Sequence, residues 1–296
     1  MKADLLLLIT AAIWGFAFVA QRVGMSHMGP FSFNAIRFSL GSLSLLPLLV
    51  WRRNRKGSQT KIVFKKIFLP GVLTGLVLFG GASLQQIGLV GTSAGKAGFI
   101  TGLYVILVPL LGLLWGRRAH MAHWAGAILA VVGLYFLSVR ENFTVSSYDL
   151  IVLAGAFLWA AHVHLIARFS DAVGPLRLSA IQFAVCGLLS TVAAFAFEVT
   201  TLANLQGGLW TILYGSFLSV GLAYTLQVVA QRTADPAHSV VILSLEGAFA
   251  ALGGWLVLEE TLYLRDLLGS GFILIGILVS QFFGAIRIKP SEDVLS

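Results

Sequence analysis

Two charged side chains stand deep inside long apolar stretches of this sequence. Glu246 lies about ten residues into one stretch and Arg37 about seven residues into another. A charge at membrane depth is costly, so it normally faces a cavity or a partner. Glu246 could bind a substrate ammonium group or a proton, and Arg37 could hold a carboxylate with two hydrogen bonds. The alternatives are a structural pair of Glu246 with Arg37 or Lys96, and a role for Arg37 in helix packing.

Aromatic and amide side chains at similar depth are the other candidates for substrate contact. Trp14 and Trp159 lie away from the membrane interfaces where tryptophan usually collects, so they could present a flat apolar surface to a substrate. Amides and hydroxyls hydrogen-bond without the cost of a charge, although packing or interhelical hydrogen bonding would also explain them. The predicted substrate-binding residues are Trp14, Arg37, Gln85, Gln86, Tyr104, Trp159, His162, Tyr224, Gln227 and Glu246.

Lys96 and His238, near the ends of two apolar stretches, are candidates for gating residues. Basic residues at such positions also extend to lipid headgroups without any specific role. We predict no catalytic residue, metal or cofactor. His162 and His164 are two residues apart, so on a helix they point to different faces and make a poor metal pair. The segment 91–97 resembles a phosphate loop but has too few residues between its glycines, and Ala97 stands where Ser or Thr is needed.

The elements that must position these side chains are membrane spans. Of the 296 residues, 58% are hydrophobic and 11% charged, and the mean hydropathy is +0.91, whereas a soluble domain has about 25% charged residues. A spanning helix needs about 20 apolar residues. Ten such stretches are expected, at 4–23, 30–51, 67–90, 94–115, 122–139, 148–167, 175–199, 208–231, 236–258 and 264–285. The sequence predicts an all-α membrane protein with no separate soluble catalytic domain.

The basic residues are divided unequally between the two sides of the expected membrane. The net charge is +8, and if the spans alternate in direction, fifteen of the 20 Lys and Arg residues fall on the side of the N-terminus and four on the other. Positive residues are retained in the cytoplasm, so both termini are predicted to be cytoplasmic. The charge therefore indicates topology and contact with a lipid bilayer, and binding of nucleic acid is not predicted.

The sequence also contains an internal duplication. Residues 4–38 recur at an offset of 145, and later segments recur at 142 and 143. We expect two repeats, 1–145 and 146–296, each with five spans; because five is odd, the second repeat enters the membrane from the opposite face. Inverted repeats place a substrate site near the midplane where the halves meet, which predicts a transporter. Equivalent positions in the two repeats include Asp4 and Asp149, Trp14 and Trp159, Arg37 and Gln182, Lys96 and His238, and Tyr104 and Glu246.

Several segments resemble the EamA-type repeat of the drug/metabolite transporter superfamily. They are 12–16, 29–30, 35–38, 97–100, 108–112, Gly126 and Gly133 in the first copy, and 248–251, 258–260, Gly269 and Gly276 in the second. The family usually has a Gly-Glu-Arg-like triplet after the fourth helix of each repeat. Here it is Gly116-Arg117-Arg118 in the first copy and Glu259-Glu260-Thr261 in the second, a departure from the family pattern.

The resemblance implies a ten-helix bundle whose cavity is lined by helices 1–4 and 6–9, and export of small metabolites, commonly amino acids. We therefore expect an exporter of the bacterial inner membrane that works by alternating access as a monomer. The paired tryptophans favour apolar or aromatic amino acids as substrates. Import, sugar-nucleotide exchange and drug efflux stay open. A membrane-embedded enzyme would need clustered His, Asp or Glu at one depth, and a sensor or scaffold would lack a cavity between the repeats.

Overall fold

The computed structural model describes residues 2–56, 64–92, 94–114, 116, 119–138, 146–259, 261 and 263–284, and all regular structure within these ranges is helical. Eight helical segments there are long and apolar enough to cross a membrane, and 121–136 is a shorter apolar helix. This confirms the predicted all-α membrane fold. The expected span ends at 115, 139 and 285 lie outside the described residues.

The helices follow the predicted order of spans. The part of the chain before residue 146 forms α1 (Lys2–Gly24), α2 (Pro30–Lys56), α3 (Phe64–Gly91), α4 (Ala94–Gly102), α5 (Tyr104–Leu114) and α6 (Met121–Ser138). The part after it forms α7 (Ser147–Val173), α8 (Pro175–Phe197), α9 (Leu202–Gly207), α10 (Leu209–Leu213), the π-helix η1 (Tyr214–Tyr224), α11 (Thr225–Ala230), α12 (Pro236–Leu243), α13 (Glu246–Leu258) and α14 (Leu264–Gly284).

Some helix starts follow directly from local sequence. Pro30, Pro175 and Pro236 begin α2, α8 and α12, where a proline costs no intrahelical hydrogen bond. The Ser146 hydroxyl accepts a hydrogen bond from the Asp149 N–H, and the Asp149 carboxylate accepts one from the Ser146 N–H, which forms a capping box at the start of α7.

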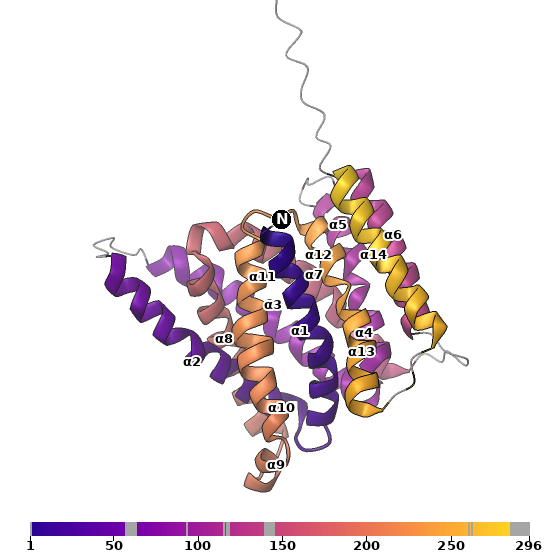
Figure 1. The fold of residues 1–296 in the computed structure, drawn as a ribbon. Coiled ribbons are helices and arrows are strands. Elements are labelled where there is room, and N and C mark those ends of the chain that lie inside the picture. Colours follow the sequence, from indigo (N-terminus) through magenta and orange to yellow (C-terminus); the bar gives the residue numbers. More distant parts are fainter. Residues whose placement is uncertain are drawn as a thin grey trace, which may run out of the picture.

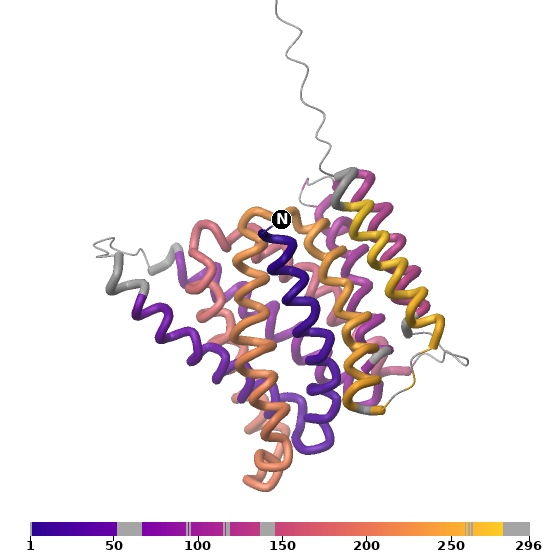
Figure 2. Tube along the Cα trace, viewed as in Figure 1, coloured from indigo at the N-terminus to yellow at the C-terminus, as the bar shows by residue number. Residues whose placement is uncertain are grey.

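The helices form one bundle with α1 near its middle (Figure 1). Helices α2 and α8 pack together on one flank, α3 packs against α7, and α6 and α14 form the opposite flank. The tube view shows α1 beginning at the same edge at which α14 ends, and α1 beside α12 and α13 (Figure 2).

Three spans are interrupted, which the sequence analysis did not predict. The fourth span divides at Leu103 into α4 and α5, and the ninth divides at Ser244 and Leu245 into α12 and α13. At both places the backbone makes tight i to i+3 hydrogen bonds: the Leu103 N–H donates to the Ile100 carbonyl, and the Leu245 N–H to the Ile242 carbonyl, each at 3.2 Å. The eighth span contains η1 in its middle. Tight turns and π-helices within long helices often mark functional sites and hinges.

Glycines let α6 and α14 pack closely. A Cβ atom at Gly126 would lie 2.6 Å from the Gly276 carbonyl oxygen, and one at Gly133 would lie 2.4 Å from the Gly269 carbonyl oxygen. Small residues commonly allow this approach of membrane helices. The contacts are reciprocal in the expected repeats, because Gly126 is equivalent to Gly269 and Gly133 to Gly276.

We expect Gly133→Ala to lower the stability of the folded protein by about 1–3 kcal/mol, because the new methyl group forces the two backbones apart. Thermal unfolding in detergent micelles measures this. Gly271→Ala is the matched control on α14, since a Cβ there meets nothing within 4 Å. Equal melting temperatures for the two variants would contradict close packing at Gly133.

Candidate functional site: a polar and aromatic cavity

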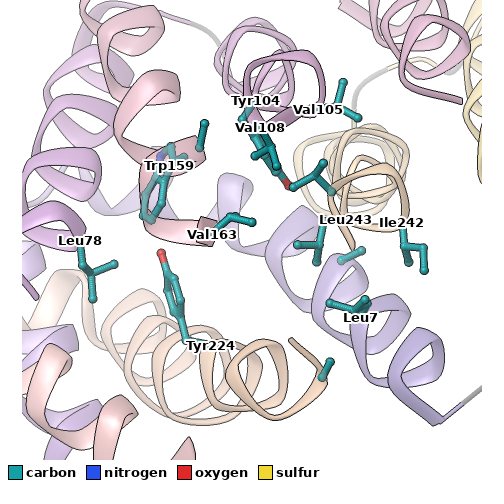
Figure 3. Close-up of a cluster of buried hydrophobic side chains, with 14 of the residues drawn as sticks. Leu7, Leu78, Tyr104, Val105, Val108, Trp159, Val163, Tyr224, Ile242 and Leu243 are labelled. Atoms are coloured by element: carbon teal, nitrogen blue, oxygen red, sulfur yellow. The ribbon is translucent and has the colours of Figure 1, made fainter. Parts of the chain in front are cut away.

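A cavity lies between the helices of the bundle. Its lining residues come from α1, α2, α3, α4, α5, α7, η1, α11, α12 and α13. Figure 3 shows the hydroxyl end of the Tyr224 side chain pointing toward Trp159. The residues that line it are Trp14, Phe18, Gln21, Arg37, Gln85, Thr101, Tyr104, Trp159, His162, Val163, Ser219, Tyr224, Gln227, Leu243 and Glu246.

Nine of the ten predicted substrate-binding residues line this one cavity, and Gln86 does not. Gln86 follows Gln85 on α3 and points to another face of the helix. It is fully buried, and its Nε2 donates to the Gln21 carbonyl oxygen at 3.5 Å. Gln86 therefore joins two helices, which is the interhelical alternative considered for these glutamines.

Most of the lining residues that the sequence analysis missed share a helix face with a predicted one. Phe18 and Gln21 follow Trp14 at helical spacing, and Val163 lies one turn after Trp159. Thr101 and Leu243 lie three residues before Tyr104 and Glu246. Helical spacing from the first candidates would have found these five residues. It does not explain Ser219, which lies within the π-helix.

The aromatic side of the cavity is built around Tyr224. The ring centroids of Trp14 and Tyr224 are 4.5 Å apart at an angle of 60°, and those of Trp159 and Tyr224 are 6.1 Å apart and nearly parallel. The N–H of each indole ring has a hydrogen-bond acceptor. Trp14 Nε1 donates to the Ser219 carbonyl oxygen at 3.2 Å, and Trp159 Nε1 donates to Gln85 Oε1 at 2.9 Å. The two tryptophans are held in place by these bonds, and their rings give the cavity an apolar surface.

A short chain of amide hydrogen bonds supports Trp159. Gln85 accepts from Trp159, and its own Nε2 donates to Gln21 Oε1 at 3.1 Å. Gln21 in turn donates to the Ala17 carbonyl oxygen of α1 at 3.1 Å. Gln85 therefore connects α3, α7 and α1 at the cavity surface.

Glu246 is the first residue of α13, is buried, and lines the cavity beside Tyr104. Among the described residues, no basic side chain lies within 4 Å of its carboxylate, and its Oε1 has no hydrogen-bond partner. The structural pairing considered for Glu246 is not formed, because Lys96 is bonded to Asp149 and Arg37 to Asn34.

Arg37 carries the opposite charge into the same cavity. Only 2% of its surface is exposed, and its Nε donates to Asn34 Oδ1 at 2.9 Å. The guanidinium carbon lies 5.4 Å from the Phe33 ring centroid and 4.8 Å from that of Phe38. No carboxylate within the described ranges is within 4 Å of it. The cavity thus holds one buried basic side chain and one buried acidic side chain that do not form a salt bridge with each other.

The seventh span differs from what the resemblance implied, since α8 contributes no residue to the cavity lining. It contributes indirectly: Gln182 Oε1 of α8 lies 2.8 Å from His162 Nε2. His162 lines the cavity next to Trp159, with ring centroids 5.8 Å apart. His164 points elsewhere, with its Nε2 2.7 Å from the Val108 carbonyl oxygen. The described residues contain no cluster of His, Cys, Asp or Glu suited to a metal ion.

The two predicted gating residues lie outside the cavity lining, and each is bonded to an aspartate at a helix start. Lys96 Nζ lies 2.6 Å from Asp149 Oδ2, and His238 Nε2 lies 3.1 Å from Asp4 Oδ1. Lys96 and His238 therefore contact aspartates of the protein, whereas the alternative considered was that their side chains extend to lipid headgroups.

The sequence model of the EamA-like transporter family matches residues 1–139 and 146–282. The chain belongs to the EamA-like transporter family. An uncharacterized transporter of Archaeoglobus fulgidus is 33% identical over 94% of this chain and 85% of its own length. The threonine/homoserine exporter RhtA of Escherichia coli K12 is 28% identical over 91% of this chain and 88% of its own length. A crystal structure 18% identical to this chain aligns with a TM-score of 0.79 over 95% of this chain and 96% of that one, which shows a shared fold.

Membership of the EamA-like family confirms the resemblance noted in the sequence and makes this protein a membrane transporter for a small molecule, not an enzyme. One departure from the family pattern lies largely outside the described residues, since Arg117, Arg118 and Glu260 are not described. Glu259 is the C-cap residue that follows α13, with a positive φ of 54°.

Proposed function

We propose that this EamA-like transporter exports small zwitterionic metabolites, above all amino acids with apolar or aromatic side chains, from the bacterial cytoplasm. The observation that carries the proposal is that Arg37 and Glu246 line one aromatic cavity and that neither forms a salt bridge with another described residue. A buried charge without a partner is strongly unfavourable. An amino acid would supply both missing partners, with its carboxylate on Arg37 and its ammonium group on Glu246.

The surface of the cavity also suits such a substrate. Pockets for small molecules usually have mostly apolar surfaces with a few polar groups. Trp14, Trp159 and Tyr224 would cover an apolar side chain, while Gln227 and Tyr104 offer hydrogen bonds. The similar protein RhtA is named as an exporter of threonine and homoserine, which are both amino acids.

We propose that transport proceeds by alternating access between two inverted repeats, 1–145 and 146–296, in the inner membrane with both termini cytoplasmic. The two family matches, the reciprocal contacts of Gly126 with Gly276 and Gly133 with Gly269, and the breaks at equivalent places in α4–α5 and α12–α13 support this arrangement. Broken helices at equivalent places of two repeats are typical of transporter binding sites. The cavity is formed within one chain, which favours a monomer as the functional unit.

Counterflow in proteoliposomes tests the substrate class. We expect labelled phenylalanine or leucine to be exchanged, and both phenethylamine and 3-phenylpropionate to compete poorly, because each lacks one of the two charged groups. Drug efflux is the second candidate, favoured by the aromatic lining and the acid Glu246. Competition by phenethylamine as strong as that by phenylalanine would support drug efflux and contradict recognition of a zwitterion.

We expect Gln85→Leu to lower transport roughly tenfold, the effect of about 1.4 kcal/mol, because Trp159 would lose its acceptor and its position. Gln86→Leu is the matched control: it removes the neighbouring buried amide of the same helix, which does not line the cavity. Initial rates of counterflow, normalised to the amount of folded protein, compare the two variants. Equal losses would show that Gln85 acts only through the fold.

A further inference from the structure

Two polar pairs join the expected halves of the molecule at opposite edges of the bundle. Lys96 on α4 binds Asp149 on α7, and His238 on α12 binds Asp4 on α1. Figure 1 places α4 at the edge away from the N-terminus and α12 at the edge that carries it. The two pairs are equivalent under the duplication, because Lys96 corresponds to His238 and Asp149 to Asp4.

The basic residue of each pair lies the same number of residues before a cavity residue. Lys96 is eight residues before Tyr104, and His238 is eight residues before Glu246, so both basic groups are about 12 Å along their helices from the cavity residues. In both spans a tight turn lies between the pair and the cavity residue. A movement that separates α4 from α7 would widen one end of the bundle, and separation of α12 from α1 would widen the other.

We propose that the Lys96–Asp149 and His238–Asp4 pairs are the two gates of the transport cycle, and that one must break for the cavity to open to its own face. The inference rests on the proposed alternating access but not on the identity of the substrate. Both pairs are formed in this structure. Opening either end therefore requires the loss of one pair, while the other continues to hold the halves together at the opposite face.

The local surroundings allow each pair to break without leaving the acid unsatisfied. Asp149 lies in the first turn of α7 and accepts a hydrogen bond from the Ser146 N–H at 2.6 Å. Asp4 lies in the first turn of α1. The partial positive charge at a helix N-terminus stabilises a carboxylate there when its basic partner moves away. His238 keeps a second contact, since its Nδ1 is 3.0 Å from Ser280 Oγ.

The two pairs differ in strength, and this difference determines the face to which the cavity opens when no substrate is bound. Lys96 is bonded at 2.6 Å, and Asp149 also accepts from the Thr92 hydroxyl at 2.8 Å. At the other edge the His238–Asp4 distance is 3.1 Å, and a histidine carries a positive charge only when it is protonated. Short charge-assisted hydrogen bonds are the stronger ones. The His238–Asp4 pair should therefore break first, so that the resting cavity opens toward the N-terminal face, where an exporter loads its substrate.

Cysteine accessibility in membrane vesicles of both orientations tests the gates. Ser219→Cys places a thiol at the cavity surface in a Cys186→Ser background, which removes the native cysteine. A membrane-impermeant maleimide then reports the rate of labelling from each face without any substrate. We expect faster labelling from the N-terminal face in the otherwise unchanged protein.

Lys96→Met should raise labelling from the opposite face about fivefold or more and lower it from the N-terminal face. His238→Met should change both rates in the reverse direction. The conservative controls exchange the equivalent residues: Lys96→His should shift the rates less than Lys96→Met, and His238→Lys should slow labelling from the N-terminal face. If Lys96→Met does not fold, Asp149→Asn removes the charge while its side-chain oxygen can still accept from Ser146, and should act in the same direction.

Rates that rise equally from both faces, or do not change in these variants, would overturn the proposal and leave the pairs as structural contacts. If the labelling changes as expected but no amino acid is transported, the gates stand and only the proposed substrate class fails.

Discussion

Replacement of Glu246 by glutamine is expected to reduce transport of zwitterionic amino acids by about a hundredfold or more. The amide keeps the size of the side chain but loses the charge that would meet the substrate ammonium group. A hydrogen bond between two charged groups in a water-poor site contributes about 2–4 kcal/mol more than its neutral counterpart. Initial rates of counterflow and substrate binding in proteoliposomes measure the loss.

The same variant is expected to leave stability unchanged or to increase it. Within the described residues Glu246 has no basic partner, so burial of its ionisable carboxyl group opposes folding more than burial of the amide isostere would. An unfavourable group retained in a cavity is typical of a binding site, where stability and function conflict. The melting temperature of Glu246→Gln should therefore equal or exceed that of the unchanged protein.

Glu198→Gln is the matched control, because Glu198 is an acid that the structure does satisfy. It accepts from the Phe31 N–H at 2.8 Å, the Ser32 N–H at 2.8 Å and the Ser32 hydroxyl at 2.6 Å, and so caps the start of α2 away from the cavity. We expect this variant to lower the melting temperature and to retain most of the transport per folded molecule. The proposed role of Glu246 would be wrong if both variants lost stability and transport in parallel.

Much of the fold followed from the sequence because a membrane imposes simple rules. The length of the spans, the polar breaks between them and the prolines at the starts of three helices predicted helix positions close to the observed ones. The cavity candidates followed from the cost of polar groups at membrane depth, which leaves few such residues to consider. That nine of ten lie around one cavity reflects this limited choice.

The sequence could not predict which residues each side chain contacts in the folded protein. Gln85 and Gln86 are adjacent and chemically identical, yet only Gln85 lines the cavity, because the rotation of α3 depends on tertiary packing. The bonding of Asp149 to Lys96 across the two halves likewise needs the three-dimensional arrangement. The break at Ser244–Leu245 contains no proline or glycine, and Gly102 beside the break at Leu103 is one of 32 glycines in the chain, so neither break stands out in the sequence.

The proposed duplication would explain why the cavity carries one basic and one acidic side chain. Arg37 is equivalent to Gln182, and Glu246 is equivalent to Tyr104, so each charge has a neutral counterpart in the other repeat. Gln182 lies against His162 and stays outside the cavity lining. In the proposed arrangement of two repeats, one repeat thus provides the basic side chain and the other the acidic one. The proposed zwitterionic substrate would be oriented along the line that joins them.

Arg37→Met is expected to weaken binding of amino acids by about a hundredfold, through loss of the bidentate contact to the carboxylate. Arg37→Lys keeps the charge but loses the planar group that lies between Phe33 and Phe38 and is fixed by Asn34, so a loss of roughly tenfold is expected. Equilibrium binding to the purified protein in detergent measures both.

A comparison of two ligands separates contact with the carboxylate from a change in the fold. Phenethylamine lacks the carboxylate, so the unchanged protein and Arg37→Met should bind it with equal affinity, whereas phenylalanine should distinguish them by the full factor. This cycle isolates the interaction of one side chain with one substrate group. If Arg37→Met weakened the binding of both ligands equally, Arg37 would act by helix packing. The proposed contact between Arg37 and the substrate carboxylate would then be wrong. If only phenylalanine were affected, the carboxylate would be assigned to Arg37, and Glu246 would be left to bind the ammonium group.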